Sequence, residues 1–425
     1  MKTVLILTYY WPPAGGPGVQ RVLKFAKYLP HFGWRPIVLT VKNGEYPAVD
    51  ETLLHDVPDD LHVHRTASLE PFALYRKLTG KTSDDRIATF VLTEENSSTS
   101  HRLATFIRGN LFIPDARIGW KPFAQRAAVE LMRDHDIDLI FSTAPPMSTH
   151  LIAKTVAQKT GRPWVADFRD PWIDVFYYHS LKRGKLAVSI DKRLEALVLQ
   201  SANAIVTVSP TLADLLEKKA NTQCYVIPNG YDVEDFQDIP PLPDDGKLHI
   251  VHAGHLAVNQ NPTRLWEALH KRFQTNDSAD RVQIDFYGSI HANIRRSLEE
   301  FGLLQHCVFH GYIPHNELVA VMKRAALLFF VVPETSYAKG IPTSKLFDYM
   351  GAGRPILGIG PEDGDAAEFL KTAQAGRVLD TSENILSFLK TVFNDDSPYT
   401  AASQTESFTR KHLTSELADL FSQLA

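Results

Sequence analysis

Residues 238–253 read DIPPLPDDGKLHIVHA, and this stretch indicates how the chain is organised. Its first part is rich in proline and aspartate, which is typical of a linker, and its second part is a short apolar run, which is typical of a buried strand. Apolar runs of this kind alternate with helical patterns on both sides of the linker. Because that alternation indicates βαβ units and parallel sheets, the sequence predicts an α/β fold with two doubly wound, Rossmann-like domains.

The apolar pattern also predicts where the elements lie. We expect strands at residues 3–7, 36–41, 61–64, 138–142, 163–167, 204–208, 224–227, 248–253, 282–287, 307–310, 327–332, 355–359 and 377–379. We expect helices at residues 123–133, 151–159, 193–199, 262–273, 316–326, 344–351 and 365–372. The expected domains are therefore 1–238 and 247–400. A terminal amphipathic helix within 403–425 has to pack on one of them, with the first domain as a candidate.

Composition narrows the class of protein. The chain has 425 residues, 44% hydrophobic and 22% charged, which suits two globular domains. Its formal net charge of −4 gives no reason to expect nucleic acid as a partner. Cys224 and Cys307 lie in apolar runs, so we expect buried thiols rather than a disulfide or a metal site. No run reaches the ~20 apolar residues of a membrane span. We expect a cytoplasmic protein, with peripheral contact to the inner face of the membrane left open.

Residues 68–119 interrupt the βα rhythm. They combine a polar stretch with an aromatic and basic run. We interpret them as an insertion in the first domain. It is either an element that faces the acceptor or a membrane, or an elaborated loop that packs on its own domain.

Two glycine-containing turns follow expected strands of the first domain. Gly15, Gly16 and Gly18 precede a helix that begins near Val19, where backbone N–H groups favour an anion. Glycines at such a turn are equally common for steric reasons, so this pattern alone does not identify a ligand. The second turn, PNGYD at 228–232, is either a plain tight turn or part of a crevice at the strand ends.

The most informative stretch is GIPTSKLFDYMGAGRPIL at residues 340–357. Thr343 and Ser344 can cap a helix that begins there. Lys345 then stands in the first turn, where a cation opposes the helix dipole unless an anionic ligand binds. Asp348 lies on the same face and could accept hydrogen bonds from ribose hydroxyls. An exposed lysine–aspartate pair is the alternative, and the surrounding pattern favours the ligand.

Four segments together resemble a known family. They are TYYWPPAGGPGVQRVLKFAKYL, PNGYD, VHAGHL and GIPTSKLFDYMGAGRPIL, in that order. The chain is similar over nearly its whole length to the retaining glycosyltransferases of family 4, also called group 1 glycosyltransferases, in the variant found in bacterial surface-polysaccharide biosynthesis. The resemblance implies the GT-B fold, with two Rossmann-like domains that face a central cleft. It also implies a nucleotide-sugar donor held by the C-terminal domain, an acceptor held by the N-terminal domain, and no required metal or other cofactor.

The resemblance assigns donor-binding residues by position. Gly16 and Gly18 match the glycine loop that faces the donor phosphates. Asp348 matches the second acidic residue of the family's E-x7-E element, which binds ribose. The first acidic position is occupied by Gly340, and this departure puts a contact to the transferred sugar in doubt.

A second departure concerns the loop after residue 253. The family often has an arginine and a lysine there, whereas this chain has His255 followed by the amides at 259–261. We therefore expect Lys345 to meet most of the diphosphate charge, with Arg264 behind it.

Charged residues end another expected strand, in the run VADFRDPW at 165–172. Where the family often has a histidine that contacts the transferred sugar, this chain has Asp167, Arg169 and Asp170. We expect these three residues to be catalytic, with the carboxylates orienting the acceptor or stabilising an oxocarbenium-like sugar. The alternative is an arginine–aspartate ion pair that holds a loop.

The run PDARIGW at 114–120 also resembles an element of the same relatives, and we place Arg117 and Trp120 on the acceptor side. The expected function is transfer of a hexosyl or N-acetylhexosaminyl group from a UDP- or GDP-sugar to a glycan or polyprenyl-diphosphate-linked acceptor. Two alternatives stay open at this point. One is a nucleotide-sugar epimerase on the same fold, and the other is a non-catalytic nucleotide-sugar-binding protein.

Overall fold

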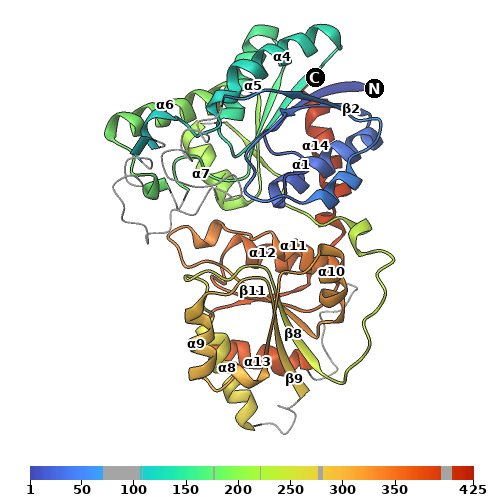
Figure 1. Cartoon of the computed structure of the whole chain (residues 1–425), viewed down its shortest axis with the longest axis vertical. Helices are drawn as coiled ribbons and strands as arrows, with labels where there is room; N and C mark the ends of the chain where they lie inside the picture. The colour runs from blue at the N-terminus through green and yellow to red at the C-terminus, as the bar shows by residue number, and fades with distance from the viewer. Residues whose placement is uncertain (70–105, 108, 176–177, 221, 276–280, 394–403) are drawn as a thin grey trace. The chain divides into compact units, whose positions relative to one another are not determined.

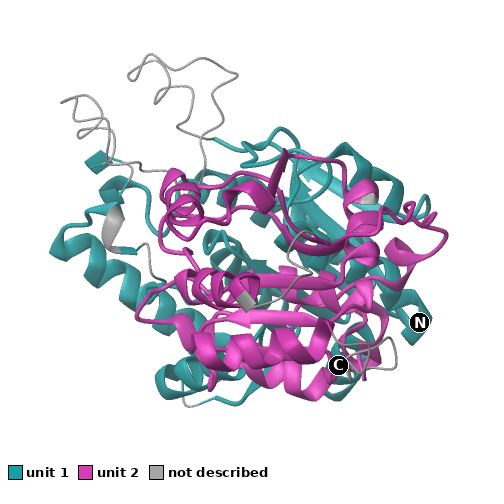
Figure 2. Ribbon diagram, turned by 90° about the horizontal axis from the view of Figure 1, so that it is seen from below, with its two compact units in different colours: residues 1–228, 413–425 teal, residues 229–412 magenta. Residues whose placement is uncertain are grey.

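The computed structural model describes residues 1–69, 106–107, 109–175, 178–220, 222–275, 281–393 and 404–425 (Figure 1). The chain divides into two compact units, coloured separately in Figure 2. Unit 1 comprises Met1–Pro228 and Leu413–Ala425, and unit 2 comprises Asn229–His412. The division therefore falls inside the PNGYD turn, before the proline-rich stretch at 238–247. Most of the expected insertion at 68–119 lies outside the described residues.

Unit 1 is built on a parallel sheet with the strand order β3-β2-β1-β4-β5-β6-β7. Its strands are β1 (Lys2–Leu7), β2 (Trp34–Val41), β3 (His62–Thr66), β4 (Leu139–Ala144), β5 (Trp164–Phe168), β6 (Ala204–Thr207) and β7 (Cys224–Val226). Strands β4 and β5 are buried at every position, which is why they read as continuous apolar runs. The expected strands of this half are confirmed, with small shifts at their ends.

Helices cover both faces of this sheet. One apolar cluster is formed with α4 (Lys121–Asp134), α5 (Ser148–Thr160), α6 (Lys185–Ser201) and α7 (Pro210–Ala220). The other is formed with α1 (Pro17–Tyr28) and α14 (Arg410–Leu424). Short 3-10 turns are η1 (Leu29–Phe32), η2 (Glu51–Asp56), η3 (Ile118–Trp120) and η4 (Tyr178–Leu181). In α14, the ring of Phe421 packs edge-on against Trp34, so the end of the chain completes the core of unit 1.

Unit 2 repeats the same architecture with the strand order β10-β9-β8-β11-β12-β13, again all parallel. Its strands are β8 (Leu248–Ala253), β9 (Val282–Tyr287), β10 (Cys307–Gly311), β11 (Leu327–Val331), β12 (Ile356–Ile359) and β13 (Gly376–Leu379). Helices α10 (His315–Arg324), α11 (Lys345–Ala352) and α12 (Asp365–Ala373) cover one face. Helices α8 (Thr263–Thr275), α9 (Ala292–Glu300) and α13 (Ser382–Phe393) cover the other. The 3-10 turns are η5 (Val233–Phe236), η7 (Leu304–His306), η8 (Ala338–Gly340) and η9 (Glu406–Phe408).

Both cysteines are free thiols. Cys224 is buried in β7, and Cys307 is half-buried at the start of β10. Burial raises the pKa of each thiol to about 12, so both stay protonated and unreactive near neutral pH. Within the described residues, no helix is both long enough and apolar enough to cross a bilayer.

Each sheet has one position where the strand order reverses. In unit 1 this switch lies between β1 and β4, and in unit 2 it lies between β8 and β11. Loops that leave such a pair of strands run in opposite directions, so ligands of α/β proteins bind at the carboxyl ends of strands there. The residues that follow these four strands are therefore candidates for a ligand-binding site.

Candidate functional site

Three neighbouring strands of unit 2 have a glycine at or directly after their carboxyl ends. Gly254 and Gly288 follow β8 and β9, and Gly311 is the last residue of β10, with φ angles of 112°, 111° and 73°. Side chains rarely adopt this conformation, so glycine is required. The backbones also approach closely, because a Cβ on Gly288 would lie 2.6 Å from the carbonyl oxygen of Gly254. These glycines clear the carboxyl edge of the sheet of side chains. They were not among the expected site residues, although a glycine after each of three adjacent strands was a visible signal.

Lys345 is the first residue of α11 and lies beside this edge. Its Nζ donates a hydrogen bond to the carbonyl oxygen of His255 at 3.4 Å. Its side chain runs against Gly254, where a Cβ would stand 2.4 Å from Lys345 Cε. Burial lowers the pKa of Lys345, an effect that Asp348 partly opposes. Among the described residues Lys345 has no ion-pair partner, so this half-buried cation is available to bind an anion.

The start of α11 differs from the expected cap. Ser344 occupies the N-cap position but has helical dihedral angles, and its side chain accepts no backbone N–H. The prediction that Thr343 and Ser344 cap the helix through their side chains is therefore wrong for Ser344. The first turn is closed instead by backbone bonds from Leu346 N–H to Thr343 O and from Phe347 N–H to Ser344 O, each 3.2 Å. The hydroxyl of Ser344 is consequently not used by the helix.

Asp348 lies in the first turn of α11 and is half-buried. Burial raises its pKa to about 6, although the neighbouring His315 and Arg410 act in the opposite direction. Asp235 adds a like charge that raises the pKa further. No hydrogen bond to Asp348 occurs among the described residues, so its oxygens can accept hydroxyl groups of a ligand.

Gly340 stands where the resembled family has an acidic residue. The space that a side chain at this position would need is filled by Tyr337. A Cβ on Gly340 would lie 2.5 Å from Cζ of the Tyr337 ring. A glutamate at 340 would therefore require Tyr337 to move. The departure from the pattern of the family that the chain resembles is accommodated by the packing of the 337–340 turn. Tyr337 was not among the expected site residues.

The loop after β8 is held by its own amides. The side chain of Gln260 accepts from Ala257 N–H at 3.1 Å and donates to Val331 O at 2.9 Å. Asn261 donates to Ser297 Oγ at 2.8 Å and accepts from the indole of Trp266 at 3.0 Å. These residues therefore support the loop.

His255 lies at the start of the same loop and is exposed. Its Nδ1 lies 2.7 Å from Ser289 Oγ, and its carbonyl holds Lys345. Arg264, the expected second cation, is ion-paired with Asp380. Lys345 is thus the better placed of the two cations to meet a phosphate.

The glycine loop of unit 1 has two different roles. Gly16 is the N-cap of α1 with φ 108°, and a Cβ there would meet nothing within 4 Å, so the loop is open at this position. Gly18 faces the guanidinium of Arg169, and a Cβ there would lie 2.3 Å from Arg169 Nη1. Packing against Arg169 explains Gly18 without a ligand, whereas Gly16 remains a candidate for one.

Asp167 lies at the end of β5 and has no exposed surface. Both of its oxygens accept from Arg21 of α1, at 2.8 and 3.2 Å, and one also accepts from Thr143 Oγ1 at 2.7 Å. Arg21 is equally buried and donates further to Pro228 O at 2.9 Å. This geometry favours the ion-pair alternative over a catalytic Asp167, with a partner that the sequence did not indicate.

Arg169 also holds backbone together. Its guanidinium donates to the carbonyl oxygens of Ala144, Gly18 and Pro145, at 3.1, 2.7 and 2.5 Å. It therefore fixes the two loops at the switch point of unit 1, which makes it a positioning residue. Asp170 is different, because it is half-buried and makes no hydrogen bond or ion pair within the described residues. Burial raises its pKa despite the neighbouring Arg169.

The two residues expected on the acceptor side lie inside unit 1. Trp120 is fully buried, and its indole donates to Thr66 Oγ1 at 2.8 Å, so it is a core residue rather than a ligand contact. Arg117 is 6% exposed and stacks on the ring of Tyr9 at 5.3 Å. Arg117 nevertheless lines a small apolar cavity of about 110 Å³. Its other walls include Tyr10, Phe112, Pro145, Met147 and Trp172.

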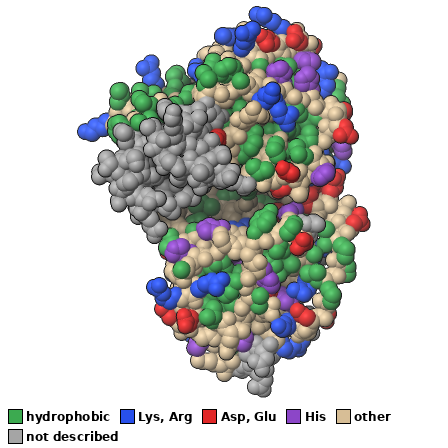
Figure 3. Space-filling view, viewed as in Figure 1, with side chains coloured by type: hydrophobic (Ala, Val, Ile, Leu, Met, Phe, Trp, Pro, Cys, Tyr) green, Lys and Arg blue, Asp and Glu red, His purple; other side chains and the backbone are tan. Residues whose placement is uncertain are grey.

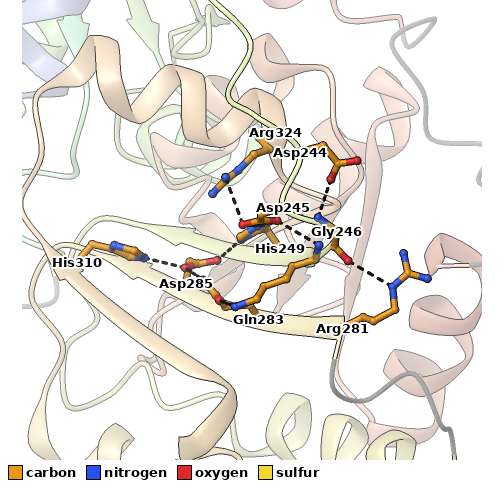
Figure 4. A network of polar contacts seen from close by, with 10 residues as sticks. Asp244, Asp245, Gly246, His249, Arg281, Gln283, Asp285, His310 and Arg324 are labelled. Atoms are coloured by element: carbon orange, nitrogen blue, oxygen red, sulfur yellow. Dashed lines mark hydrogen bonds and ion pairs between the residues drawn. The ribbon is translucent and has the colours of Figure 1, made fainter.

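A polar network inside the unit 2 sheet is a separate feature (Figure 4). Asp285 of β9 bridges His249 of β8 at 2.6 Å and His310 of β10 at 2.7 Å, and it accepts from Gln283 at 2.8 Å. The second ring nitrogen of His249 lies 3.1 Å from Asp245. His249 and Asp285 are buried, so the network ties three strands together. Across the described part of the chain, no group of three or more His, Cys, Asp or Glu side chains is arranged to hold a metal ion.

Comparison with known proteins gives a family match over part of the chain and structural matches over its whole length. The model of one family, Glycosyltransferase Family 4, matches residues 81–235. A comparison with curated protein sequences gave no match. Among solved structures, the chain is similar to a glycosyltransferase from Rickettsia africae, with a TM-score of 0.62 and 13% identity over 100% of this chain and 98% of that chain.

Two further structures are similar over 100% of both chains. One is Anabaena HepE in complex with UDP-glucose, with a TM-score of 0.60 and 14% identity. The other is the lipopolysaccharide outer core galactosyltransferase WaaB, with a TM-score of 0.59 and 12% identity. Likeness at such low identity establishes the fold. The two units with their parallel sheets therefore form the GT-B fold, as the sequence predicted.

Proposed function

We propose that the protein is a retaining glycosyltransferase. It moves a hexosyl or N-acetylhexosaminyl group from a UDP- or GDP-sugar to a glycan or polyprenyl-diphosphate-linked acceptor in cell-surface polysaccharide biosynthesis. The observation that carries the proposal is Lys345, a half-buried cation with lowered pKa and no ion-pair partner among the described residues. It stands at a helix N-terminus against Gly254, where a diphosphate would neutralise it. The family match, the GT-B fold and the UDP-glucose complex of a structural neighbour support this choice of ligand.

The donor is assigned to unit 2. Its diphosphate binds Lys345 and the N-terminus of α11, with the hydroxyls of Thr343 and Ser344 and the backbone at His255 nearby. Its ribose hydroxyls donate to Asp348, whose oxygens accept no hydrogen bond from the described residues. Gly16 offers an open N-terminus of α1 for negative charge in unit 1. The proposed reaction uses no metal ion or other cofactor.

The chemistry follows from where charge develops. The bond between the anomeric carbon and the phosphate oxygen breaks, and its electron pair leaves with the diphosphate. Lys345 and the α11 N–H groups stabilise that charge, and one such donor is worth ~10²- to 10³-fold in rate. The acceptor hydroxyl attacks the same face of the sugar and gives its proton to the leaving phosphate. In unit 1, Asp170 is the candidate for orienting the acceptor, and Arg169 positions the loops around it.

The test is a screen of UDP-, GDP- and dTDP-sugars with free and lipid-linked acceptors. Release of nucleoside diphosphate that requires an acceptor, together with a product of retained anomeric configuration by NMR, is expected. Conversion of a donor without any acceptor would identify an epimerase instead. Donor binding without release of nucleoside diphosphate would identify a nucleotide-sugar-binding protein. The observation behind this alternative is that Gly340 stands where the family has an acidic residue, with Tyr337 in the space of its side chain. If the protein neither binds nor turns over any of these sugars, the proposal is overturned.

A further inference from the structure

The two central strands of the unit 2 sheet, β8 and β11, pair over a short distance. Residues 250–251 of β8 lie opposite residues 327–328 of β11, and among the described residues the pairing of these two strands ends there. In this register the next bond of the parallel ladder would run from Ala253 N–H to Phe329 O. Each of these two groups bonds instead to the hydroxyl of Tyr349 in α11. A side-chain hydroxyl therefore takes the place of a main-chain bond at the switch point of unit 2.

Tyr349 has no exposed surface. Its hydroxyl accepts from Ala253 N–H at 2.9 Å and donates to Phe329 O at 3.2 Å. The same carbonyl lies 3.0 Å from His252 Nδ1. Burial lowers the pKa of His252 to about 3, so its ring is neutral, and Nδ1 carries the proton because its partner is a carbonyl. Without the tyrosine hydroxyl, the buried Ala253 N–H would lose its partner.

Tyr349 and Lys345 lie four residues apart and therefore on one face of α11. Both side chains contact the end of β8. Tyr349 holds the N–H of Ala253, and Lys345 donates to the carbonyl oxygen of His255 at 3.4 Å. These two contacts flank Gly254, against which the Lys345 side chain runs. The place of the lysine amine relative to the strand end therefore depends on how firmly the Tyr349 hydroxyl joins α11 to β8.

We propose that Tyr349 is a positioning residue for the donor site. Its hydroxyl sets the separation of β8 and β11 beyond their short pairing and holds α11 against the end of β8. Lys345 and Asp348, which precede it in the same helix, are thereby kept in place for a diphosphate and a ribose. The effect on the donor rests on the proposed function, whereas the effect on the Lys345 amine does not.

A role in stability alone is the alternative, because a buried tyrosine hydroxyl needs a partner in any case. That role predicts the same consequences from the loss of any comparable buried hydrogen bond. Thr40→Val is a matched control, since Thr40 is buried in β2 of unit 1 and its hydroxyl donates to Tyr9 O at 3.0 Å. Tyr349→Phe keeps the ring and removes only the hydroxyl. Urea unfolding should show a similar loss of stability in the two variants.

The first measurement is the Kd of UDP and of GDP by calorimetry. We expect Tyr349→Phe to raise the Kd of the nucleotide that wild type binds by about ten-fold or more, because displaced groups no longer meet the diphosphate. Thr40→Val should bind like wild type. The double variant Lys345→Ala/Tyr349→Phe should lose less than the product of the two single losses, since Tyr349 acts in part through the lysine.

The second measurement is the reactivity of the Lys345 amine, which needs no ligand. Labelling with acetic anhydride at a series of pH values, read by mass spectrometry, gives the pKa of each lysine. Burial lowers the pKa of Lys345 in the wild-type protein. In Tyr349→Phe we expect this pKa to rise towards the ordinary value, because α11 no longer holds the amine against the strand. Basic side chains are spread over the visible face of both units (Figure 3), so exposed lysines in the same sample serve as references.

Three outcomes would overturn the proposal. They are an unchanged pKa of Lys345 in Tyr349→Phe, an equal rise of Kd in Thr40→Val, and fully multiplicative losses in the double variant. If wild type binds neither UDP nor GDP, the proposed donor site fails instead, and the labelling of Lys345 alone decides whether Tyr349 positions the lysine.

Discussion

Lys345 and Gly254 are in direct contact across the switch point of unit 2. A methyl group at position 254 would stand 2.4 Å from Lys345 Cε and 3.2 Å from its Nζ. Gly254 follows β8, and Lys345 begins the helix after β11. The strand order of the sheet reverses between these two strands. The position of the lysine amine therefore depends on the space that is left by a glycine.

Gly254→Ala should displace this amine. We expect kcat/KM for the donor to fall at least about ten-fold, because the added Cβ pushes Lys345 away from the diphosphate. Gly302→Ala is the matched control. Gly302 also has positive φ, 67°, but a Cβ there would meet nothing within 4 Å. Both variants should lose similar stability from backbone strain, and only Gly254→Ala should lose donor affinity. Equal kinetic effects would show that strain alone is responsible.

Lys345→Ala should lower turnover at least about ten-fold, with the loss mainly in kcat if the lysine stabilises the leaving diphosphate. Lys339→Ala, an exposed lysine of the same unit that pairs with Asp363, should leave kcat unchanged. Because burial lowers the pKa of Lys345 in the free protein, a bound diphosphate should raise it again. Calorimetry in buffers of different ionisation enthalpy should therefore detect proton uptake on binding at alkaline pH. An unchanged kcat in Lys345→Ala would remove the lysine from the mechanism.

Asp348 should make donor binding depend on pH. Its pKa is raised to about 6, so below that pH it is protonated and loses acceptor capacity. We expect the donor Kd to rise as pH falls from 7 to 5, and this rise to be absent in Asp348→Asn. The same substitution should stabilise the fold. The pKa of Asp348 in the folded state lies above the usual value of an aspartate, so the native state favours the protonated form, and this stability is lost as pH rises towards 6.

The stability effect can be measured separately from binding. Urea unfolding at pH 8 should show Asp348→Asn more stable than wild type by about 1–3 kcal/mol, and the difference should shrink at pH 4. A variant that binds the donor like wild type at every pH would remove Asp348 from the ribose site, whatever its stability.

Asp170→Asn should lower turnover without lowering stability. Its carboxylate has no partner among the described residues, and burial raises its pKa, so an amide costs the fold little. If Asp170 orients the acceptor, we expect at least about a ten-fold loss of kcat/KM for the acceptor, with donor Kd unchanged. If Asp170→Asn has wild-type kinetics, Asp170 does not orient the acceptor.

The sequence predicted the scaffold because its signals are local. A buried parallel strand must be apolar along its length, so runs such as the one at 248–253 identify their own strands. Lys345 was predictable for a similar reason, since a cation in the first turn conflicts with the helix dipole within a few residues. Gly340 was identified as a departure, but its cause was not, because Tyr337 fills the space only once the turn is folded.

Residues whose partners are distant in sequence were harder. Asp167 looks like a site carboxylate when read beside Arg169, yet its partner Arg21 lies 146 residues earlier. Trp120 was placed on the acceptor side from its local run, but its indole donates to Thr66 in β3. Charge and aromaticity at a strand end are compatible with both a site and a core, and only the packing of other elements decides between them.

The Arg21–Asp167 pair allows that decision to be tested. Both side chains are fully buried, so Asp167→Asn leaves an uncompensated guanidinium, and Arg21→Met leaves an uncompensated carboxylate. Each single variant should lose about 3–5 kcal/mol of unfolding free energy, whereas Arg21→Met/Asp167→Leu should recover most of it, because two apolar residues need no partner. The folded fraction of Asp167→Asn should keep a kcat within a few-fold of wild type. If turnover instead disappears in Asp167→Asn while urea unfolding is unchanged, Asp167 acts on substrate and the catalytic assignment made from the sequence is restored.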